Sequence, residues 1–176
     1  MNVSGRELHQ PDYYQQVVDV LIRTGLPPQR LVLEVTESTM EADSPVALDA
    51  LRRLRADGVR IAIDDFGTGY SSLSRLHHLP ADILKIDRSF TASIGPHDAG
   101  APLIAAITGL AHALGLTTVA EGVEHRYQAD VLARHGCDEN QGWLHGRPDA
   151  PALIHAALAA QARRSAVTFE QHTGVR

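Results

Sequence analysis

Short apolar runs alternate along the chain with longer stretches in which apolar residues recur at helical spacing. The short runs are typical of strands buried in a sheet, and the longer stretches are typical of helices with one apolar face. The strand pattern occurs at 31–36, 59–63, 81–87, 117–120 and, more weakly, 137–141. The helical pattern occurs over 11–24, 44–56, 72–78, 101–114, 127–135 and from 151 to about 163. Residues 2–4 are too short a segment to assign from the pattern alone.

Residues that begin or end helices agree with these bounds. Gly25 and Gly115 follow two of the helical stretches, as expected at a helix C-terminus. Ser44 is placed to cap the N-terminus of the stretch over 44–56. We expect the buried faces of the first two helices to consist of Val17, Val18, Leu21 and Ile22, and of Leu48, Leu51 and Leu54.

Strands and helices therefore alternate, with connections of a few residues between them. This order predicts an α/β domain with a parallel sheet and right-handed crossovers. We expect residues 1–163 to form one domain. The polar segment 164–176 has no clear period, and we expect it to be a flexible tail.

Polar side chains capable of chemistry occur where each predicted strand ends and a loop begins. In a barrel of parallel strands these ends meet on one face. The sequence therefore predicts a cluster of carboxylates with one lysine and one amide, formed by Glu34, Asp64, Asp65, Lys85, Glu121 and Gln141.

Adjacent carboxylates such as Asp64 and Asp65 repel each other unless a cation, a proton or a basic group compensates. Carboxylate and amide oxygens suit Mg²⁺ or Mn²⁺, and two such ions can activate water for in-line displacement at phosphorus. Lys85 could then offset charge on a phosphate or help to position the attacking water. The alternatives are a solvated Asp-Asp turn followed by a helix cap, and a set of surface ion pairs at loop ends.

Composition excludes several other classes of protein. The 176 residues carry a net charge of −5 with acidic and basic residues interspersed, so we expect no binding of DNA or RNA through a basic face. The single cysteine, Cys137, excludes an intrachain disulfide framework and permits a cytoplasmic location, and we expect it in the core. No apolar run is long enough to span a bilayer, and the first residues lack the apolar core of a signal peptide.

Two further motifs carry less information. The glycines of the segment 67–69 match neither a P-loop nor a dinucleotide-binding fingerprint, so they are better suited to a mobile loop over the site. The ten histidines show no metal-binding spacing, and we expect them at the surface, with His145 a candidate for the edge of the site.

Several motifs, in their order and spacing, resemble those of the EAL domain, the bacterial cyclic di-GMP phosphodiesterase module. The resemblance covers the chain to about residue 163. The matching stretches are Asn2-Val-Ser4, Leu33-Glu-Val-Thr-Glu-Ser38, Asp64-Asp-Phe-Gly-Thr-Gly-Tyr-Ser-Ser72, Leu84-Lys-Ile-Asp87, Ala120-Glu-Gly-Val-Glu124, and Gln141-Gly142 followed by Arg147-Pro148.

The resemblance implies a TIM-like (β/α) barrel in which two Mg²⁺ or Mn²⁺ ions support hydrolysis of cyclic di-GMP to the linear dinucleotide pGpG. It implies that Lys85 is the catalytic lysine and that Gln141 supports the metal-bound water. Glu37 resembles the glutamate that anchors the loop 66–72, which links the site to dimerisation, so a homodimer through the region 65–72 is expected. The residues that resemble metal ligands are Asn2, Glu34, Asp64 and Asp65, with Glu121 as a further acidic residue of the metal site.

One motif of the family is missing from this sequence. The Glu-Ala-Leu motif that gives the family its name lies on the first barrel strand and provides a metal-binding glutamate, and the 176 residues contain no such segment. We therefore expect an incomplete barrel, truncated at its amino end, with about six of the eight strand-helix units and impaired hydrolysis. The alternative is a catalytically inactive EAL-like module that binds cyclic di-GMP or a partner protein.

Overall fold

The computed structural model describes residues 1–36, 39, 44–67, 79–95, 100–154 and 159. The chain divides into two compact units, 1–145 and 146–176. In the second unit the described residues include a helical stretch at 151–154, at the start of the helix predicted over 151–163, and Asp149 Oδ1 accepts a hydrogen bond from the backbone N–H of Ala150 at 2.8 Å. The predicted tail 164–176 lies outside the described residues. No helix of the described residues is long and apolar enough to cross a membrane.

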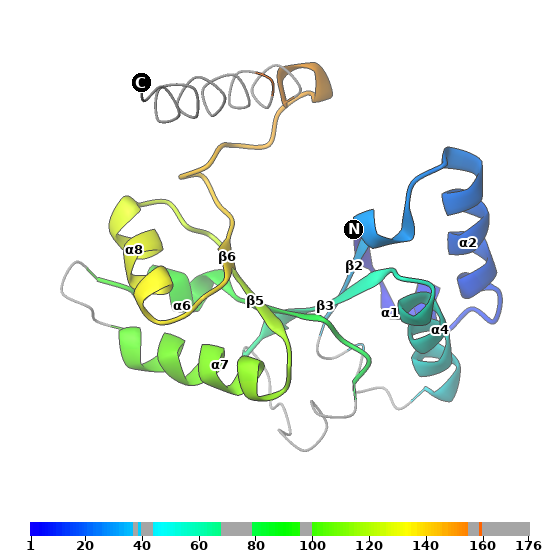
Figure 1. Cartoon of the computed structure of the whole chain (residues 1–176), viewed down its shortest axis with the longest axis horizontal. Helices are drawn as coiled ribbons and strands as arrows, with labels where there is room; N and C mark the ends of the chain where they lie inside the picture. The colour runs from blue at the N-terminus through cyan, green and yellow to red at the C-terminus, as the bar shows by residue number, and fades with distance from the viewer. Residues whose placement is uncertain (37–38, 40–43, 68–78, 96–99, 155–158, 160–176) are drawn as a thin grey trace, which may run out of the picture. The chain divides into compact units, whose positions relative to one another are not determined.

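The first unit alternates strands and helices, as predicted (Figure 1). Its elements are β1 (Asn2–Val3), α1 (Gly5–Leu8), α2 (Tyr13–Thr24), the 3-10 helix η1 (Pro28–Arg30), β2 (Val32–Thr36), α4 (Pro45–Ala56), β3 (Arg60–Phe66), β4 (Ile83–Ile86), α6 (Arg88–Ala92), α7 (Ala101–Ala113), β5 (Thr117–Ala120), α8 (Arg126–Arg134) and β6 (Glu139–Asn140).

The six strands form one parallel sheet in the order β1-β2-β3-β4-β5-β6, so each strand pairs with its neighbours in the sequence. This confirms the predicted α/β class and the parallel sheet. The sheet is not closed: among the described residues, β1 and β6 pair on one side each. A hollow of about 690 Å³ lies beside β1, and its lining includes Val3 together with Val17 and Leu21 of α2.

The two faces of the sheet carry different residues because successive side chains in a strand point to opposite sides. One face supplies fully buried apolar side chains to the core, namely Leu33, Val35, Ile61, Ile63, Leu84 and Ile86. The residues that alternate with them in the same strands, Glu34, Asp64 and Lys85, therefore lie on the opposite face. The alternation of the sequence thus separates the core from the polar cluster.

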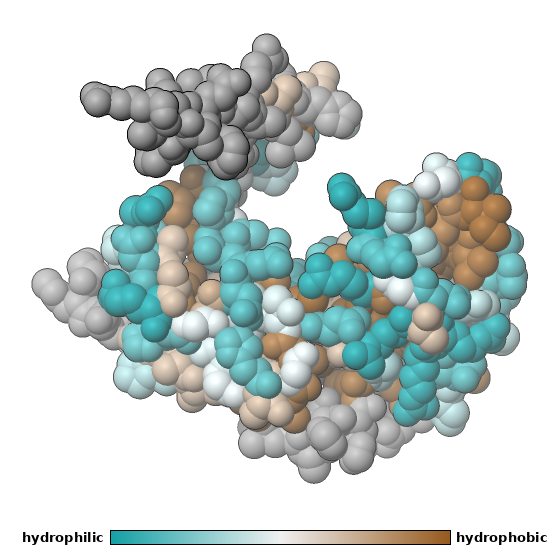
Figure 2. All heavy atoms as spheres, in the orientation of Figure 1, coloured by the Kyte–Doolittle hydropathy of each residue, from teal (hydrophilic) through white to brown (hydrophobic). Residues whose placement is uncertain are grey.

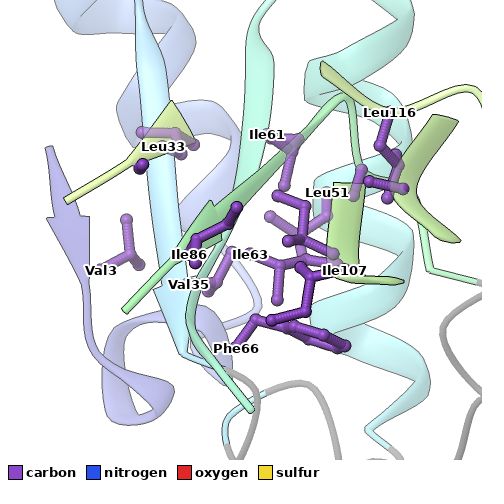
Figure 3. Packing of buried hydrophobic residues seen from close by; sticks show 14 of the residues in the cluster. Val3, Leu33, Val35, Leu51, Ile61, Ile63, Phe66, Ile86, Ile107 and Leu116 are labelled. Carbon is purple, nitrogen blue, oxygen red and sulfur yellow. The ribbon is translucent and has the colours of Figure 1, made fainter. Parts of the chain in front are cut away.

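Helices supply the remaining core residues. Helix α4 contacts α2 and β3, and α7 contacts β5 and α8. Leu51 of α4 and Ile107 of α7 belong to the same hydrophobic cluster as the strand residues Ile61 and Ile63 (Figure 3). The predicted cap at Ser44 is present: its side chain accepts a hydrogen bond from the backbone N–H of Ala47 at 3.3 Å.

The predicted buried faces of the first two helices are partly wrong. Val17 and Leu21 are buried, but Ile22 is 75% exposed, because Tyr13, Val17 and Leu21 form the inward row at four-residue spacing. Figure 2 shows hydrophobic surface, in brown, over α2, where Val20 and Ile22 are among the exposed apolar residues. In α4 the side chains turned inward are Ala47, Ala50, Leu51 and Leu54, and Leu48 is half-buried.

Three local features differ from the sequence prediction. Strand β3 does not end at Ile63 but continues through Phe66, with a register shift against β4 between Ile63 and Phe66. Asp65 in this bulge has a φ of 55°, a conformation that non-glycine residues seldom adopt. Helices α1 and α6 were not predicted, and the helix predicted over 72–78 lies outside the described residues.

Candidate functional site

The ammonium group of Lys85 lies at the centre of a cluster of carboxylates. Its Nζ atom is 2.8 Å from Oε2 of Glu34, 2.9 Å from Oδ1 of Asp64 and 2.5 Å from Oε1 of Glu121. The side chain of Lys85 is 7% exposed, and those of its three partners are between 14% and 24% exposed. The structure therefore brings together four of the residues that the sequence predicted to form one site.

Four neighbouring strands position these groups. Glu34 is the central residue of β2, Asp64 lies in β3, Lys85 lies in β4, and Glu121 directly follows β5. The expectation that all of these residues lie where a strand ends was wrong for Glu34, Asp64 and Lys85, which are within strands. They meet because the alternation of each strand turns them to the face away from the helices.

The charges in the cluster stabilise the protonated form of Lys85. Burial opposes the charge of the ammonium, but the contacts with Glu121, Glu34 and Asp64 outweigh it and raise the pKa of Lys85 above its ordinary value. Three carboxylates surround the ammonium of Lys85, and the N-terminal ammonium of Met1 lies 3.9 Å from Oε1 of Glu34, so the two cations leave one negative charge in excess. Such an excess attracts a further cation.

Asp64 is the least exposed carboxylate of the cluster, and one of its oxygens lacks a hydrogen bond. Its Oδ1 atom is buried and, among the described residues, has no hydrogen-bond partner. The contact of 2.9 Å with Nζ of Lys85 is an ion pair without hydrogen-bond geometry. The ammonium offsets the charge of this oxygen but leaves it without a hydrogen bond, so a ligand that bonds to it would lower the remaining cost in free energy.

Gln141 joins the cluster through Glu121. Its Nε2 atom donates a hydrogen bond of 2.8 Å to Oε1 of Glu121, the same oxygen that contacts Lys85. The backbone N–H of Gln141 bonds to the carbonyl of Ala120 at 2.8 Å, so the pairing of β6 with β5 brings Gln141 to its place. The predicted proximity of Glu121, Lys85 and Gln141 is therefore present.

Asn2 and Asp65 lie at the margins of the site. Asn2 is exposed in β1, in register with Glu34, and the carbonyl of Met1 accepts a hydrogen bond of 2.9 Å from the backbone N–H of Glu34. Asp65 is exposed in the bulge of β3. Their predicted role as metal ligands stays a prediction.

Other predicted residues fall outside the cluster or outside the described part of the chain. Glu37 and the loop 68–72, for which anchoring and dimerisation were predicted, lie outside the described residues. His145 is exposed, and its Nε2 atom lies 2.5 Å from Oδ1 of Asn140. Cys137 is half-buried beside the core, and burial raises the pKa of its thiol.

The contacts of two further residues, Gln128 and Gly142, were not predicted from the sequence. Gln128 is 5% exposed; its Oε1 atom accepts hydrogen bonds from the backbone N–H groups of Glu124 and His125, both at 2.9 Å, and its Nε2 atom donates to the carbonyl of Thr91 at 3.1 Å. Gln128 is the third residue of α8 and accepts a hydrogen bond from the backbone N–H of the N-cap residue His125, which is one half of a capping box. Gly142 packs against the backbone of Val123, which no local pattern reveals.

The donor set fits a divalent cation of the magnesium class. The groups are carboxylate and amide oxygens, the ligands that Mg²⁺ and Mn²⁺ prefer. Among the described residues, Oδ1 of Asp64 faces the ammonium of Lys85 but accepts no hydrogen bond. Over the described residues, no three His, Cys, Asp or Glu side chains are grouped as a metal centre. In this arrangement the ammonium of Lys85 compensates the carboxylates.

The sequence and the fold of this chain are similar to those of known proteins. The EAL domain family matches residues 1–148. The chain is 43% identical over 159 residues to the bifunctional diguanylate cyclase/cyclic di-GMP phosphodiesterase MucR of Pseudomonas aeruginosa; this covers 90% of the chain and 23% of MucR. The chain spans about a fifth of the length of the curated relatives that it matches first.

Solved structures share the fold. The MucR phosphodiesterase in complex with c-di-GMP matches with a TM-score of 0.79 and 45% identity, over 87% of this chain and 62% of that one. The EAL domain of Mycobacterium smegmatis DcpA matches with a TM-score of 0.84 and 42% identity, over 91% and 71%. Klebsiella pneumoniae BlrP1, in a complex with manganese and cyclic di-GMP, matches with a TM-score of 0.75 and 34% identity, over 84% and 38%.

Proposed function

The chain belongs to the EAL domain family, and on that premise we propose that its Lys85 cluster is part of a site that hydrolyses cyclic di-GMP to pGpG with the help of two Mg²⁺ or Mn²⁺ ions. The related MucR is a cyclic di-GMP phosphodiesterase, and BlrP1 holds manganese together with cyclic di-GMP. These relatives support the choice of substrate and of metal.

The observation that carries the proposal is the convergence of Glu34, Asp64 and Glu121 on Lys85. A lysine that only balanced charge for stability would need one carboxylate partner, and here three carboxylates from separate strands meet one ammonium. Surplus negative charge in a parallel sheet of this kind is a cost unless it serves a ligand.

We propose that Glu34, Asp64 and Asp65 hold the metal ions, with Asn2 and Glu121 as further ligands. When bound, the ions would supply electrophilic activation of the phosphodiester and of the attacking water. With Glu34, Asp64 and Glu121 serving as metal ligands, the ammonium of Lys85 would be available to bind the phosphate.

Lys85, Glu121 and Gln141 would act on the reacting groups. A lysine ammonium carries a proton and a positive charge at neutral pH, so Nζ of Lys85 could donate a hydrogen bond to a phosphate oxygen or to the attacking water. Glu121 and Gln141 share a hydrogen bond, which fixes the orientation of the Glu121 carboxylate beside Nζ. Their task would be to keep the water in line with the phosphorus.

The sequence and the sheet give reasons to expect slow turnover by these 176 residues alone. The sequence contains no Glu-Ala-Leu segment, and the sheet is open beside β1, next to Asn2 and Glu34. A loosely held set of ligands positions water poorly. The experiment is to incubate the protein with cyclic di-GMP and Mg²⁺ or Mn²⁺ and to measure pGpG by chromatography.

A second candidate, from a different class, is an EAL-like module that binds cyclic di-GMP without hydrolysing it or that binds a partner protein. Calorimetry separates the two candidates. Binding of intact cyclic di-GMP with no pGpG formed, even after a segment with the missing glutamate is added, would favour the binding module. Metal-dependent appearance of pGpG after that addition would favour the phosphodiesterase.

A further inference from the structure

Gly142 lies in direct contact with the backbone of Val123, in the segment that follows Glu121. A Cβ atom at position 142 would be 2.3 Å from both the backbone nitrogen and the carbonyl oxygen of Val123, distances that real Cβ atoms do not adopt. Gly142 also has a φ of 155°, which side-chain-bearing residues adopt rarely. Position 142 therefore tolerates no side chain without movement of one of the two segments.

The contact is held on both sides by hydrogen bonds to Val123. The backbone N–H of Val123 donates to the carbonyl of Gln141 at 3.0 Å, and the carbonyl of Val123 accepts from the N–H of Leu144 at 2.9 Å. The residues just before and just after the Gly142–Trp143 pair are thus bonded to one residue of the facing segment. Any separation at Gly142 would stretch both bonds.

Gln141 and Glu121 lie directly beside this contact. Nε2 of Gln141 reaches Oε1 of Glu121 at 2.8 Å, and that oxygen contacts Nζ of Lys85 at 2.5 Å. We propose that Gly142 is a positioning residue: by allowing the backbones of Val123 and Gln141 to meet, it sets the Gln141 amide against Glu121 and thereby orients the Glu121 carboxylate in the site.

The chain offers a matched control for this proposal. Gly146 has a φ of 154°, almost the same as that of Gly142, but a Cβ atom there would meet none of the described residues within 4 Å. Gly142→Ala and Gly146→Ala therefore carry a similar cost in backbone conformation. The two variants differ in the clash with Val123, so a difference between them reports that contact.

The first measurement needs neither metal nor activity. The side-chain amide signals of Gln141 in ¹⁵N–¹H spectra report its hydrogen bond to Glu121. We expect Gly142→Ala to move these signals to the position found in Glu121→Ala, and Gly146→Ala to leave them unchanged. Wild-type Gln141 signals in a folded Gly142→Ala protein would overturn the proposal.

The second measurement rests on the proposed function. Groups that orient metal ligands typically change metal affinity by about 10–100-fold when they are lost, so we expect Gly142→Ala to raise the Mn²⁺ concentration at half-maximal thermal stabilisation about tenfold. Gly146→Ala should stay within about twofold of wild type. The same Mn²⁺ response in both alanine variants would overturn the positioning role, whereas no response in wild type would contradict the proposed metal site and leave the amide signals to decide.

A further variant covers the case in which Gly142→Ala does not fold. Gln141→Asn withdraws the amide from Glu121 by one methylene group and leaves Gly142 and Val123 untouched. We expect it to raise the Mn²⁺ concentration at half-maximal thermal stabilisation about tenfold relative to wild type, because the amide no longer orients the Glu121 carboxylate. A wild-type Mn²⁺ response in Gln141→Asn would show that the placement of this amide has no consequence and would overturn the proposal.

Discussion

Nζ of Lys85 lies 2.5 Å from Oε1 of Glu121, so a residue inside β4 is bonded to the residue that directly follows β5. The backbones of the two strands also meet there, because the N–H of Glu121 donates to the carbonyl of Ile86 at 3.0 Å. The contact therefore combines sheet pairing with a partly buried charge pair. The ammonium shared with Glu34 and Asp64 makes Lys85 the residue on which the cluster depends.

Removal of the ammonium should destabilise the fold. In Lys85→Met the three carboxylates lose their shared partner, and we expect a loss of about 2–3 kcal/mol, less than for a fully buried pair because the carboxylates are partly exposed. Mn²⁺ should restore part of the loss, since a cation can replace the ammonium. Urea unfolding with and without Mn²⁺ measures both effects.

The control for that variant is Arg126→Met, which removes a cation from an exposed pair with Asp130. Such surface pairs contribute little to stability, so this variant should unfold like wild type. Equal stability of Lys85→Met and Arg126→Met would show that the carboxylates of the cluster do not need Lys85.

Divalent cations should stabilise the protein through Asp64. A ligand that binds the folded state alone raises its stability, by about 2.7 kcal/mol when it is present at a hundred times its dissociation constant. We expect Mg²⁺ or Mn²⁺ to raise the melting temperature of wild type and to have no such effect on Asp64→Asn. Thermal unfolding with increasing metal measures this.

Asp19→Asn serves as the comparison, because Asp19 lies on α2 and accepts a hydrogen bond from Gln15 away from the cluster. It should respond to metal like wild type. An undiminished shift in Asp64→Asn would place the metal elsewhere in the protein.

Asp138 should make stability depend on acid pH. Hydrogen bonds from His112 and Thr118 lower the pKa of Asp138 to about 2. A carboxylate with a lowered pKa stabilises the fold above its unfolded pKa of about 3.9, and this contribution is lost as the pH falls toward about 2. Wild type should therefore be more stable than Asp138→Asn at pH 6, and the difference should shrink between pH 4 and pH 2. The side chain is 40% exposed, so solvent reduces the size of the effect.

Urea unfolding of both proteins at several pH values measures the difference. Asp149→Asn controls for the general effect of removing a carboxylate. If the difference in the free energy of unfolding between wild type and Asp138→Asn stays constant from pH 6 to pH 2, the ionised carboxylate of Asp138 does not stabilise the fold.

The main elements of the fold could be predicted where one local signal decides the structure. Gly25 ends α2 in a left-handed conformation, Ser44 caps α4, and the apolar run 117–120 forms β5. Each depends on backbone conformation or on burial of a short segment, which neighbouring residues specify. The α/β order followed from these elements.

Features that depend on distant residues could not be predicted in the same way. The bulge at Asp65 arises from the pairing of β3 with β4, and the exposure of Ile22 depends on which residues of α2 face the core. Helix α6 is five residues long and begins at the cap residue Asp87, too short for a periodic pattern. The contact of Gly142 with Val123 joins segments that are not adjacent in the sequence.

The members of the site were predictable, but their geometry was not. A polar residue that interrupts or follows an apolar run can be identified from the sequence alone, and this applies to Glu34, Asp64, Lys85 and Glu121. That Lys85 lies between the carboxylates follows from the register of four strands, which the sequence does not specify locally.

The proposed phosphodiesterase site around Lys85 is tested most directly by joining the chain to a segment that carries the Glu-Ala-Leu motif. In the EAL domain of MucR, the region that matches residues 1–148 is replaced by those residues, and pGpG formed from cyclic di-GMP is measured by chromatography with Mg²⁺ and with Mn²⁺. We expect metal-dependent pGpG from the chimera, very little or none from residues 1–176 alone, and loss of product in chimeras with Lys85→Ala or Asp64→Asn. A folded chimera that forms no pGpG, or that forms it equally well with Lys85→Ala, would contradict the assignment of this cluster as a phosphodiesterase site.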